Sequence, residues 1–106
     1  MGEATRVYIG IGSNLGDRER YIKKSVEMLG GAPEIRFLRV SRIVETDSLL
    51  GDDQPSYLNA VAEVETELDA KGSLRSLGEI ETLLGRVRKD KWAPRTIDLD
   101  LLLYGG

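Results

Sequence analysis

The sequence of 106 residues contains neither cysteine nor histidine. The absence of cysteine excludes a disulfide framework and a thiolate metal site, so we expect the chain to work in a reducing cytoplasm. The absence of histidine excludes an imidazole general base and a histidine-ligated metal within this chain. A metal bound here would therefore have oxygen ligands, which are the ligands that hard divalent cations prefer.

The chain also lacks long apolar runs and an excess of positive charge. No apolar run approaches the roughly 18 residues of a membrane-spanning helix, and the first six residues lack the apolar core of a signal peptide. The formal net charge is −3, with one Phe and one Trp, whereas RNA-binding sheets need aromatic strand residues and a basic surface. We therefore expect no membrane partner, no nucleic-acid partner, and one domain over residues 1–106 that is a monomer or a weak homodimer.

The most informative stretch, residues 86–103, joins a basic segment to a short strand pattern. The basic segment carries five cations, at Arg86, Arg88, Lys89, Lys91 and Arg95. After it, every second residue is apolar, and this period of two predicts a strand over residues 96–103 with a core face made of Ile97, Leu99, Leu101 and Leu103. The same period places Asp98 and Asp100 together on the other face, with Cα atoms roughly 6.5–7 Å apart.

This acidic pair beside basic side chains favours a metal-bound polyphosphate ligand. Two carboxylates at this spacing repel each other unless a cation lies beside them. Mg²⁺ takes one or two carboxylates and completes its shell with water and phosphate, while guanidinium groups hold further phosphate oxygens. The alternative is an exposed Asp-x-Asp pair on a solvated strand face beside a basic surface loop, an arrangement that is common and needs no function.

The remaining patterns predict two helices and three more strands. We expect strands over residues 6–12, 35–46 and 57–68, with a long loop over residues 47–56. The first helix, capped by Asn14 or Asp17, has an apolar face of Leu15, Ile22, Val26 and Leu29. The second helix, capped by Ser73 and ended by Gly85, has core positions Leu74, Leu77, Ile80 and Leu84. The Gly-x-Gly of Gly10 and Gly12 has the wrong spacing for dinucleotide binding, and we assign these glycines to a tight turn.

The resulting order is βαββαβ. This order predicts an α+β, ferredoxin-like fold in which two main helices cover one face of a four-stranded antiparallel sheet.

Three separated motifs carry a resemblance to a known family. They are Tyr8-Ile-Gly-Ile-Gly-Ser-Asn-Leu-Gly16, Asp53-Gln-Pro-Ser-Tyr-Leu-Asn-Ala60, and Arg86-Val-Arg-Lys89 followed by Trp92-Ala-Pro-Arg-Thr-Ile-Asp-Leu-Asp-Leu-Leu-Leu-Tyr-Gly105. In this order they resemble 6-hydroxymethyl-7,8-dihydropterin pyrophosphokinase, an enzyme family of folate biosynthesis. The resemblance implies transfer of the β,γ-diphosphate of ATP to the hydroxymethyl oxygen of a reduced pterin, with release of AMP.

The resemblance also implies roles for individual residues. Two Mg²⁺ ions would lie between Asp98, Asp100 and the phosphates of ATP. Other matches on the ATP side are Arg86, Arg88 and Arg95, which handle the phosphates, and Glu81, which lies near the nucleotide. Trp92 matches the aromatic of a loop that closes over both substrates, and we expect Lys89–Pro94 to be mobile without ligand. On the pterin side the matches are Thr46, Leu49, Tyr57 and Asn59, with Tyr57 stacking on the ring and Asn59 pairing with its amide-like edge.

The chain departs from the family pattern in three places. Asp47 and Ser48 stand where the family usually has prolines, and the basic loop is one residue shorter than in some members. The resemblance also does not extend to the family's C-terminal part, so the sequence represents either a fragment or a short relative with impaired or altered activity. In either case we expect weak pterin binding and slow transfer. The functional alternative is a non-catalytic ferredoxin-like module that binds a nucleotide, a pterin or a partner.

Overall fold

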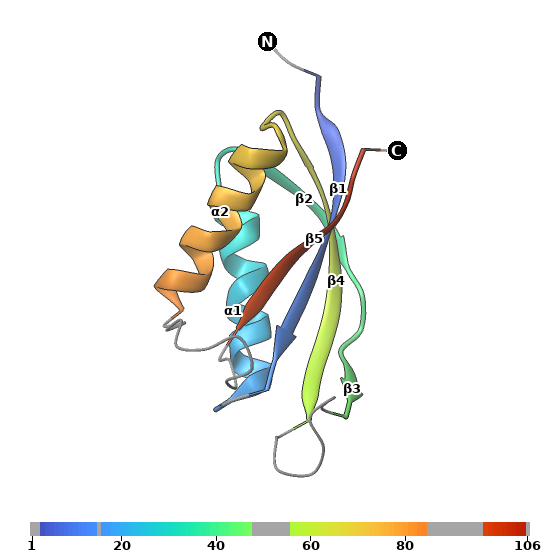
Figure 1. The fold of residues 1–106 in the computed structure, drawn as a ribbon, viewed down its shortest axis with the longest axis vertical. Helices are drawn as coiled ribbons and strands as arrows, with labels where there is room; N and C mark the ends of the chain where they lie inside the picture. Colours follow the sequence, from blue (N-terminus) through green and yellow to red (C-terminus); the bar gives the residue numbers. More distant parts are fainter. Residues whose placement is uncertain (1–2, 15, 48–55, 85–96, 106) are drawn as a thin grey trace.

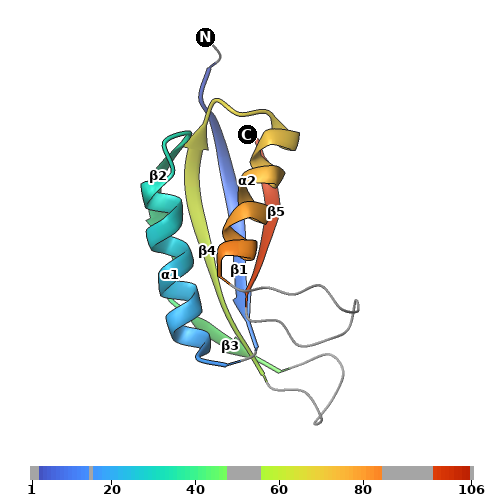
Figure 2. The same cartoon turned by 90° about the vertical axis from the view of Figure 1, so that its left-hand side faces the viewer.

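The computed structural model describes residues 3–14, 16–47, 56–84 and 97–105. Their elements follow the order β1 (Thr5–Ser13), α1 (Arg18–Gly31), β2 (Ile35–Val40), β3 (Val44–Thr46), β4 (Tyr57–Thr66), α2 (Ala70–Leu83) and β5 (Asp98–Tyr104). Both helices lie on the same face of one sheet, and no described helix covers the opposite face (Figures 1 and 2). The predicted α+β, ferredoxin-like fold is confirmed.

The sheet is antiparallel throughout, in the order β2-β4-β1-β5, and β3 also pairs with β4. The long strands β1 and β4 therefore form the centre of the sheet, and β5 is an edge strand that pairs with β1. The end of β1 and the starts of β4 and β5 lie at one end of the sheet, the lower end in Figure 1. We call the helix-free side the open face.

The sheet has five strands where four were predicted, because the strand expected over residues 35–46 is interrupted. At Ser41 the backbone N–H donates to the carbonyl oxygen of Val61 at 2.8 Å, while the N–H of Val61 donates to the Ser41 hydroxyl at 2.9 Å. A side-chain oxygen thus replaces a backbone carbonyl in the ladder, a competition to which serine is prone. The strand resumes as β3, beside the same neighbour.

The core lies between the helices and the inner face of the sheet. Ile22 and Leu29 of α1 are buried as predicted, and Val26 is partly buried against them. Asp17 caps α1, since its carboxylate accepts the N–H of Arg20 at 3.2 Å. The other buried apolar side chains come from the sheet, from α2 and from Ile97 just before β5, namely Val7, Ile9, Ile11, Ile35, Ala60, Ala62, Val64, Leu77, Ile80, Ile97 and Leu99.

The predicted start of the second helix was wrong by four residues. Asp69 is the cap of α2, because its carboxylate accepts the N–H of Gly72 at 2.7 Å. Ser73 instead lies buried in the first turn and begins the stripe that continues through Leu77 and Ile80. Leu74 is one residue out of phase with this stripe and is 52% exposed, so its predicted core position was also wrong. Among the described residues no helix is long and apolar enough to cross a membrane.

The predicted alternation in the last strand holds only to Leu101. The pairing of β5 with β1 shifts register, since Tyr8 pairs with Leu103 but the adjacent Ile9 pairs with Leu101. Leu102 is thus an extra residue, a β-bulge, and the residues after it change face. Leu103 is 62% exposed for this reason, whereas a core position was predicted.

Candidate functional site

Asp98 and Asp100 lie on the same face of β5, as the alternation predicts. In the ladder they are opposite Gly12 and Gly10 of β1, and Leu99 between them turns into the core, where it is 5% exposed. Both carboxylates therefore belong to the open face. Asp98 is half-buried and Asp100 is exposed, so a ligand can reach both from solvent.

A polar group from β3 and β4 lies on the same face. Asn59 pairs with Gly12 on the other side of β1, and Tyr57 is two residues earlier in β4, hence on the same face. Thr46 of β3 is opposite Tyr57, and its hydroxyl accepts a hydrogen bond from the Asn59 amide nitrogen at 2.7 Å. Three residues matched to the pterin side by resemblance thus meet in one place.

Two glycines separate the acidic pair from this polar group, and our assignment of them to a tight turn was wrong. Gly10 and Gly12 are inside β1, and the positive φ of a turn is found instead at Gly16 (φ 73°). A Cβ added at Gly12 would lie 3.4 Å from Oδ1 of Asn59, and one at Gly10 would lie 3.3 Å from the Leu102 side chain. On this face β1 has no side chains of its own, but the Leu102 side chain lies against Gly10, and Gly12 is buried beside Asn59 and Tyr57. A glycine inside a strand often marks the close approach of a ligand.

The distance between the acidic pair and the polar group would let one extended ligand contact both. The acidic row on β5 and the polar row on β4 are two strand spacings apart, about 10 Å. The alternation of Gly10 and Gly12 with the buried Ile9 and Ile11 was the sequence signal for a strand that has no side chains of its own on one face.

Glu81 of α2 reaches the strand that carries the aspartates. The residue is 5% exposed, and its carboxylate accepts the backbone N–H of Leu99 at 2.7 Å. It thus contacts the residue between Asp98 and Asp100, from the helix side of the sheet. No pattern in the sequence predicts this contact, which joins residues 18 positions apart.

A second contact that no sequence pattern predicts lies beside Thr46 and Tyr57. The Arg18 guanidinium, at the start of α1, donates to the Ser56 carbonyl and hydroxyl, both at 2.9 Å, and pairs with the Glu45 carboxylate at 3.2 Å. The Ser56 hydroxyl also donates to Glu45. The hydrogen bond from Ser56 and the nearby Arg18 charge hold the pKa of Glu45 below its usual value. This cluster ties the end of β3 to the start of β4.

Farther along the open face, the Glu63 carboxylate is buried among cations. It bonds with Arg39, pairs with Arg6 at 3.2 Å and accepts the Tyr8 hydroxyl at 3.1 Å. The hydrogen bond from Arg39 lowers the pKa of Glu63, against the opposing effect of burial, and Tyr8 and Arg6 act in the same direction as Arg39. Both arginines are thus occupied by a carboxylate, and we do not assign this cluster to a ligand.

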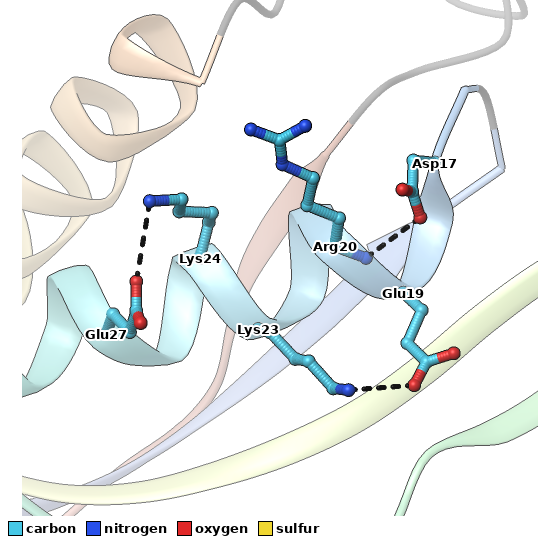
Figure 3. A pocket seen from close by; sticks show the side chains of 6 residues that line it. All are labelled: Asp17, Glu19, Arg20, Lys23, Lys24 and Glu27. Atoms are coloured by element: carbon cyan, nitrogen blue, oxygen red, sulfur yellow. Dashed lines mark hydrogen bonds and ion pairs between the residues drawn. The ribbon is translucent and has the colours of Figure 1, made fainter.

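The outer surface of α1 carries a shallow, charged hollow (Figure 3). Its side chains pair with one another, as in Lys23 with Glu19 at 2.9 Å and Lys24 with Glu27 at 3.7 Å. All four side chains are more than half exposed, and exposed pairs of this kind contribute little. The hollow is a solvated helix surface.

Several predicted site residues lie outside the described residues. They are Leu49 of the predicted pterin loop, and Arg86, Arg88, Trp92 and Arg95 of the basic segment, together with the expected mobile loop Lys89–Pro94. Their predicted roles stay predictions.

The described side chains suit a metal that is shared with a substrate. In the described ranges no group of three or more acidic, cysteine or histidine side chains could enclose a metal ion. Asp98 and Asp100 offer two carboxylates on an accessible face, which fits Mg²⁺ that takes its other ligands from water and phosphate. The donor set is also all oxygen, as the absence of cysteine and histidine requires.

Comparison with known proteins gives a consistent result. A family model described as 7,8-dihydro-6-hydroxymethylpterin-pyrophosphokinase matches residues 8–105. The chain is 42% identical over 97 residues to a 2-amino-4-hydroxy-6-hydroxymethyldihydropteridine pyrophosphokinase of Bacillus subtilis, a match that covers 92% of this chain and 58% of the relative. It is also 42% identical over 102 residues to a protein of that name from Methylorubrum extorquens, covering 96% and 65%. The chain thus spans about three fifths of the length of these relatives.

Proposed function

Because the chain belongs to the 7,8-dihydro-6-hydroxymethylpterin-pyrophosphokinase family, we propose that it transfers diphosphate from ATP to 6-hydroxymethyl-7,8-dihydropterin. In this reaction the hydroxymethyl oxygen forms a bond to the β-phosphorus of ATP. The bond from the β-phosphorus to the oxygen that bridges to the α-phosphate breaks, AMP leaves, and the hydroxyl proton passes to solvent. We place the reaction in folate biosynthesis and in the cytoplasm.

One observation carries the proposal. An acidic pair and a polar group lie on the same open face of the sheet, about two strand spacings apart, with Gly10 and Gly12 of β1, the glycine strip, between them. An acidic pair suits a metal-bound polyphosphate, while an aromatic ring beside an amide suits a flat, hydrogen-bonding heterocycle. The reacting oxygen and phosphorus would meet between these two groups, on the open face.

The residues divide into two groups by role. Asp98 and Asp100 hold Mg²⁺, which when bound neutralises charge on the phosphates and aligns them. Tyr57 stacks on the pterin, and Asn59, oriented by its hydrogen bond to Thr46, pairs with the ring's polar edge. By resemblance, Arg86, Arg88 and Arg95 bind the phosphates, and Trp92 covers the substrates. Catalysis of this kind rests on positioning and charge neutralisation, so the missing histidine is no obstacle.

An assay of AMP release tests the proposal. The chain is incubated with ATP, Mg²⁺ and 6-hydroxymethyl-7,8-dihydropterin, and AMP is measured with and without the pterin. We expect pterin-dependent AMP that disappears when Mg²⁺ is chelated. Mg²⁺-dependent ATP binding without any AMP would support the non-catalytic module instead, and the absence of nucleotide binding would contradict both functions.

A further inference from the structure

We propose that Glu81 is a positioning residue that fixes the strand register on which the Asp98–Asp100 pair depends. The proposal rests on the proposed function in so far as the two carboxylates act together on one ligand. It differs from the role that resemblance gives to Glu81, which is a place near the nucleotide.

The need for such a residue follows from the glycine strip. Cross-strand side-chain pairs are a main source of register stability in antiparallel sheets. Opposite Asp98 and Asp100, β1 has Gly12 and Gly10, which have no side chains, so neither aspartate forms a cross-strand side-chain pair with β1. Registers in glycine-rich strands are weakly specified, and a slip of one residue would turn both carboxylates into the core.

The rest of β5 does not compensate fully. It is an edge strand whose pairing with β1 shifts register at the bulge of Leu102. Its C-terminal half therefore follows a different register from the half that bears the aspartates. This half has anchors of its own, since the Tyr104 hydroxyl donates to the Leu68 carbonyl oxygen at 2.6 Å and the Gly105 N–H donates to the Arg6 carbonyl oxygen at 2.9 Å, but these contacts lie beyond the bulge and not beside the aspartates. On the core side, Ile97 and Leu99 anchor the strand by packing, which tolerates some sliding more readily than a hydrogen bond does.

Glu81 contacts Leu99, the residue between the two aspartates. Backbone N–H groups of an edge strand point alternately toward and away from the neighbouring strand, and the N–H of Leu99 meets Glu81 Oε2 at 2.7 Å. A slip by one residue would remove this N–H from the carboxylate. Leaving a buried carboxylate poorly bonded is costly, so the contact penalises the slipped register directly.

The burial of Glu81 indicates that its carboxylate holds β5 through a hydrogen bond and does not merely fill space in the core. The residue is 5% exposed in the last turn of α2, beside Ile80 at 6%. An apolar side chain at this position would satisfy packing without the desolvation of a carboxylate. A buried carboxylate bonded to a backbone N–H instead joins the rigid helix to the functional strand, as outer-shell partners do at metal sites.

Two substitutions separate positioning from direct ligand contact. Glu81→Gln keeps a carbonyl oxygen that can accept the Leu99 N–H, and Glu81→Leu removes the acceptor. Glu79→Leu, at an exposed position of the same helix, is the matched control. The measurements are hydrogen exchange of the Leu99 and Asp100 amides without ligand, and the Mg²⁺ dependence and kcat of AMP release.

For Glu81→Leu we expect amide exchange at Leu99 to become about 10- to 100-fold faster, the factor for a hydrogen bond to a charged group. We expect its kcat to fall by about the same factor, as for lost outer-shell partners, with a higher Mg²⁺ requirement. Glu81→Gln should stay within about threefold of the original chain in all three measurements, and Glu79→Leu should be unchanged.

Two results would overturn the proposal. Unchanged Leu99 exchange in Glu81→Leu would show that the carboxylate does not hold the strand. A loss of activity in Glu81→Gln equal to that in Glu81→Leu, with Leu99 exchange intact, would show that the charge acts directly on a ligand. If Glu81→Leu does not fold, Glu81→Gln alone decides between these roles. If the original chain releases no AMP, the proposed function fails, and amide exchange still tests the holding of β5.

Discussion

Asp98 and Asp100 have similar places on β5 but different surroundings. Asp98 is half-buried opposite Gly12, and Asp100 is exposed opposite Gly10. The residues of β1 opposite the two carboxylates are glycines, so β1 places no side chain between the carboxylates and a bound metal. We therefore expect the acidic pair to bind ligand, and its removal should lower ligand affinity more than it lowers the stability of the fold.

The substitutions Asp98→Asn and Asp100→Asn test this expectation. Each keeps the side-chain shape but removes a charge, which relieves the repulsion between the carboxylates and deletes a metal ligand. We expect Mg²⁺-dependent ATP affinity to fall by more than about a hundredfold, since even outer-shell partners are worth about 10- to 100-fold. Titration calorimetry measures the affinity, and thermal unfolding should show a transition close to the original. Unchanged Mg²⁺ dependence in both variants would place the metal elsewhere.

A substitution at Gly12 separates an effect on stability from an effect on ligand binding. A methyl group at this position would meet Asn59 Oδ1 at 3.4 Å and Tyr57 Cδ1 at 3.6 Å, which are ordinary contacts. We expect Gly12→Ala to be as stable as the original or more stable by about 0.4–1 kcal/mol, through a less flexible unfolded chain. The methyl should lower pterin affinity about tenfold, within the roughly 1–3 kcal/mol that an added methyl imposes on a packed contact.

Fluorescence titration with the pterin and thermal unfolding measure these two effects. Gly30→Ala on α1, where an added Cβ meets nothing within 4 Å, is the matched control and should leave pterin affinity unchanged. Undiminished pterin affinity in Gly12→Ala would mean that the ligand does not lie over the glycine strip.

At the scale of elements, the Arg18 cluster holds three segments together. Arg18 begins α1, Glu45 is in β3, and Ser56 directly precedes β4. These contacts join positions 27 and 38 residues apart in the chain, beside Thr46 and Tyr57. The cluster therefore fixes the mutual placement of β3 and β4, on which the polar group of the open face depends.

The substitution Glu45→Gln should weaken this arrangement selectively. Loss of the charge weakens the contacts to Arg18 and Ser56, so we expect the pterin KM to rise about three- to tenfold while the ATP KM changes little. Steady-state kinetics with each substrate varied in turn measures both. Arg20→Gln, an exposed position on the same helix, serves as control. An equal rise in both KM values would indicate a general loss of structure.

The sequence predicted these elements better than their connections. The period of two correctly predicted the faces of the β5 residues as far as Leu101. Because three consecutive leucines fit either face, the sequence does not indicate the bulge at Leu102. Asp69 and Ser73 are both good helix caps, and only the fold decides between them. Glu81 bonds to a backbone N–H, a partner that has no sequence pattern at all.

The candidate site was predictable where it followed from alternation, as for the common face of Asp98 and Asp100. The resemblance supplied Thr46, Tyr57 and Asn59, which the structure brings together. The glycine strip was missed because Gly-x-Gly occurs in turns as well as inside strands. Which of the two applies here depends on where β1 ends. A pattern in one strand cannot show which side chains its neighbours place beside it.

For the molecule as a whole, Glu63 links three strands through its bonds to Arg39 of β2 and to Tyr8 and Arg6 of β1. These contacts lower its pKa from an ordinary value of 4.5. A lowered pKa means that the stabilisation is present above this ordinary value and is lost as pH falls through the lower folded-state pKa. The fold should therefore lose stability in acid partly through Glu63.

The variant Glu63→Gln should show a weaker dependence of stability on pH than the original chain, because it has no carboxylate to protonate. Urea unfolding at about pH 7 and about pH 4 measures the difference. Glu65→Gln is the control, since its carboxylate makes only longer ion pairs, at 3.8 Å to Arg6 and 3.7 Å to Arg36. Identical pH profiles for the original chain and Glu63→Gln would contradict this assignment.

The central claim is that ATP and its metal bind on the open face of the sheet, and nuclear magnetic resonance tests it most directly. A non-hydrolysable ATP analogue is added to the ¹⁵N-labelled chain with Mg²⁺, which is then replaced in part by paramagnetic Mn²⁺. We predict that the amides of Gly10, Gly12, Asp98 and Asp100 broaden first, while those of Lys23 and Lys24 on α1 remain sharp. Broadening centred on α1, with the glycine strip unaffected, would contradict the account.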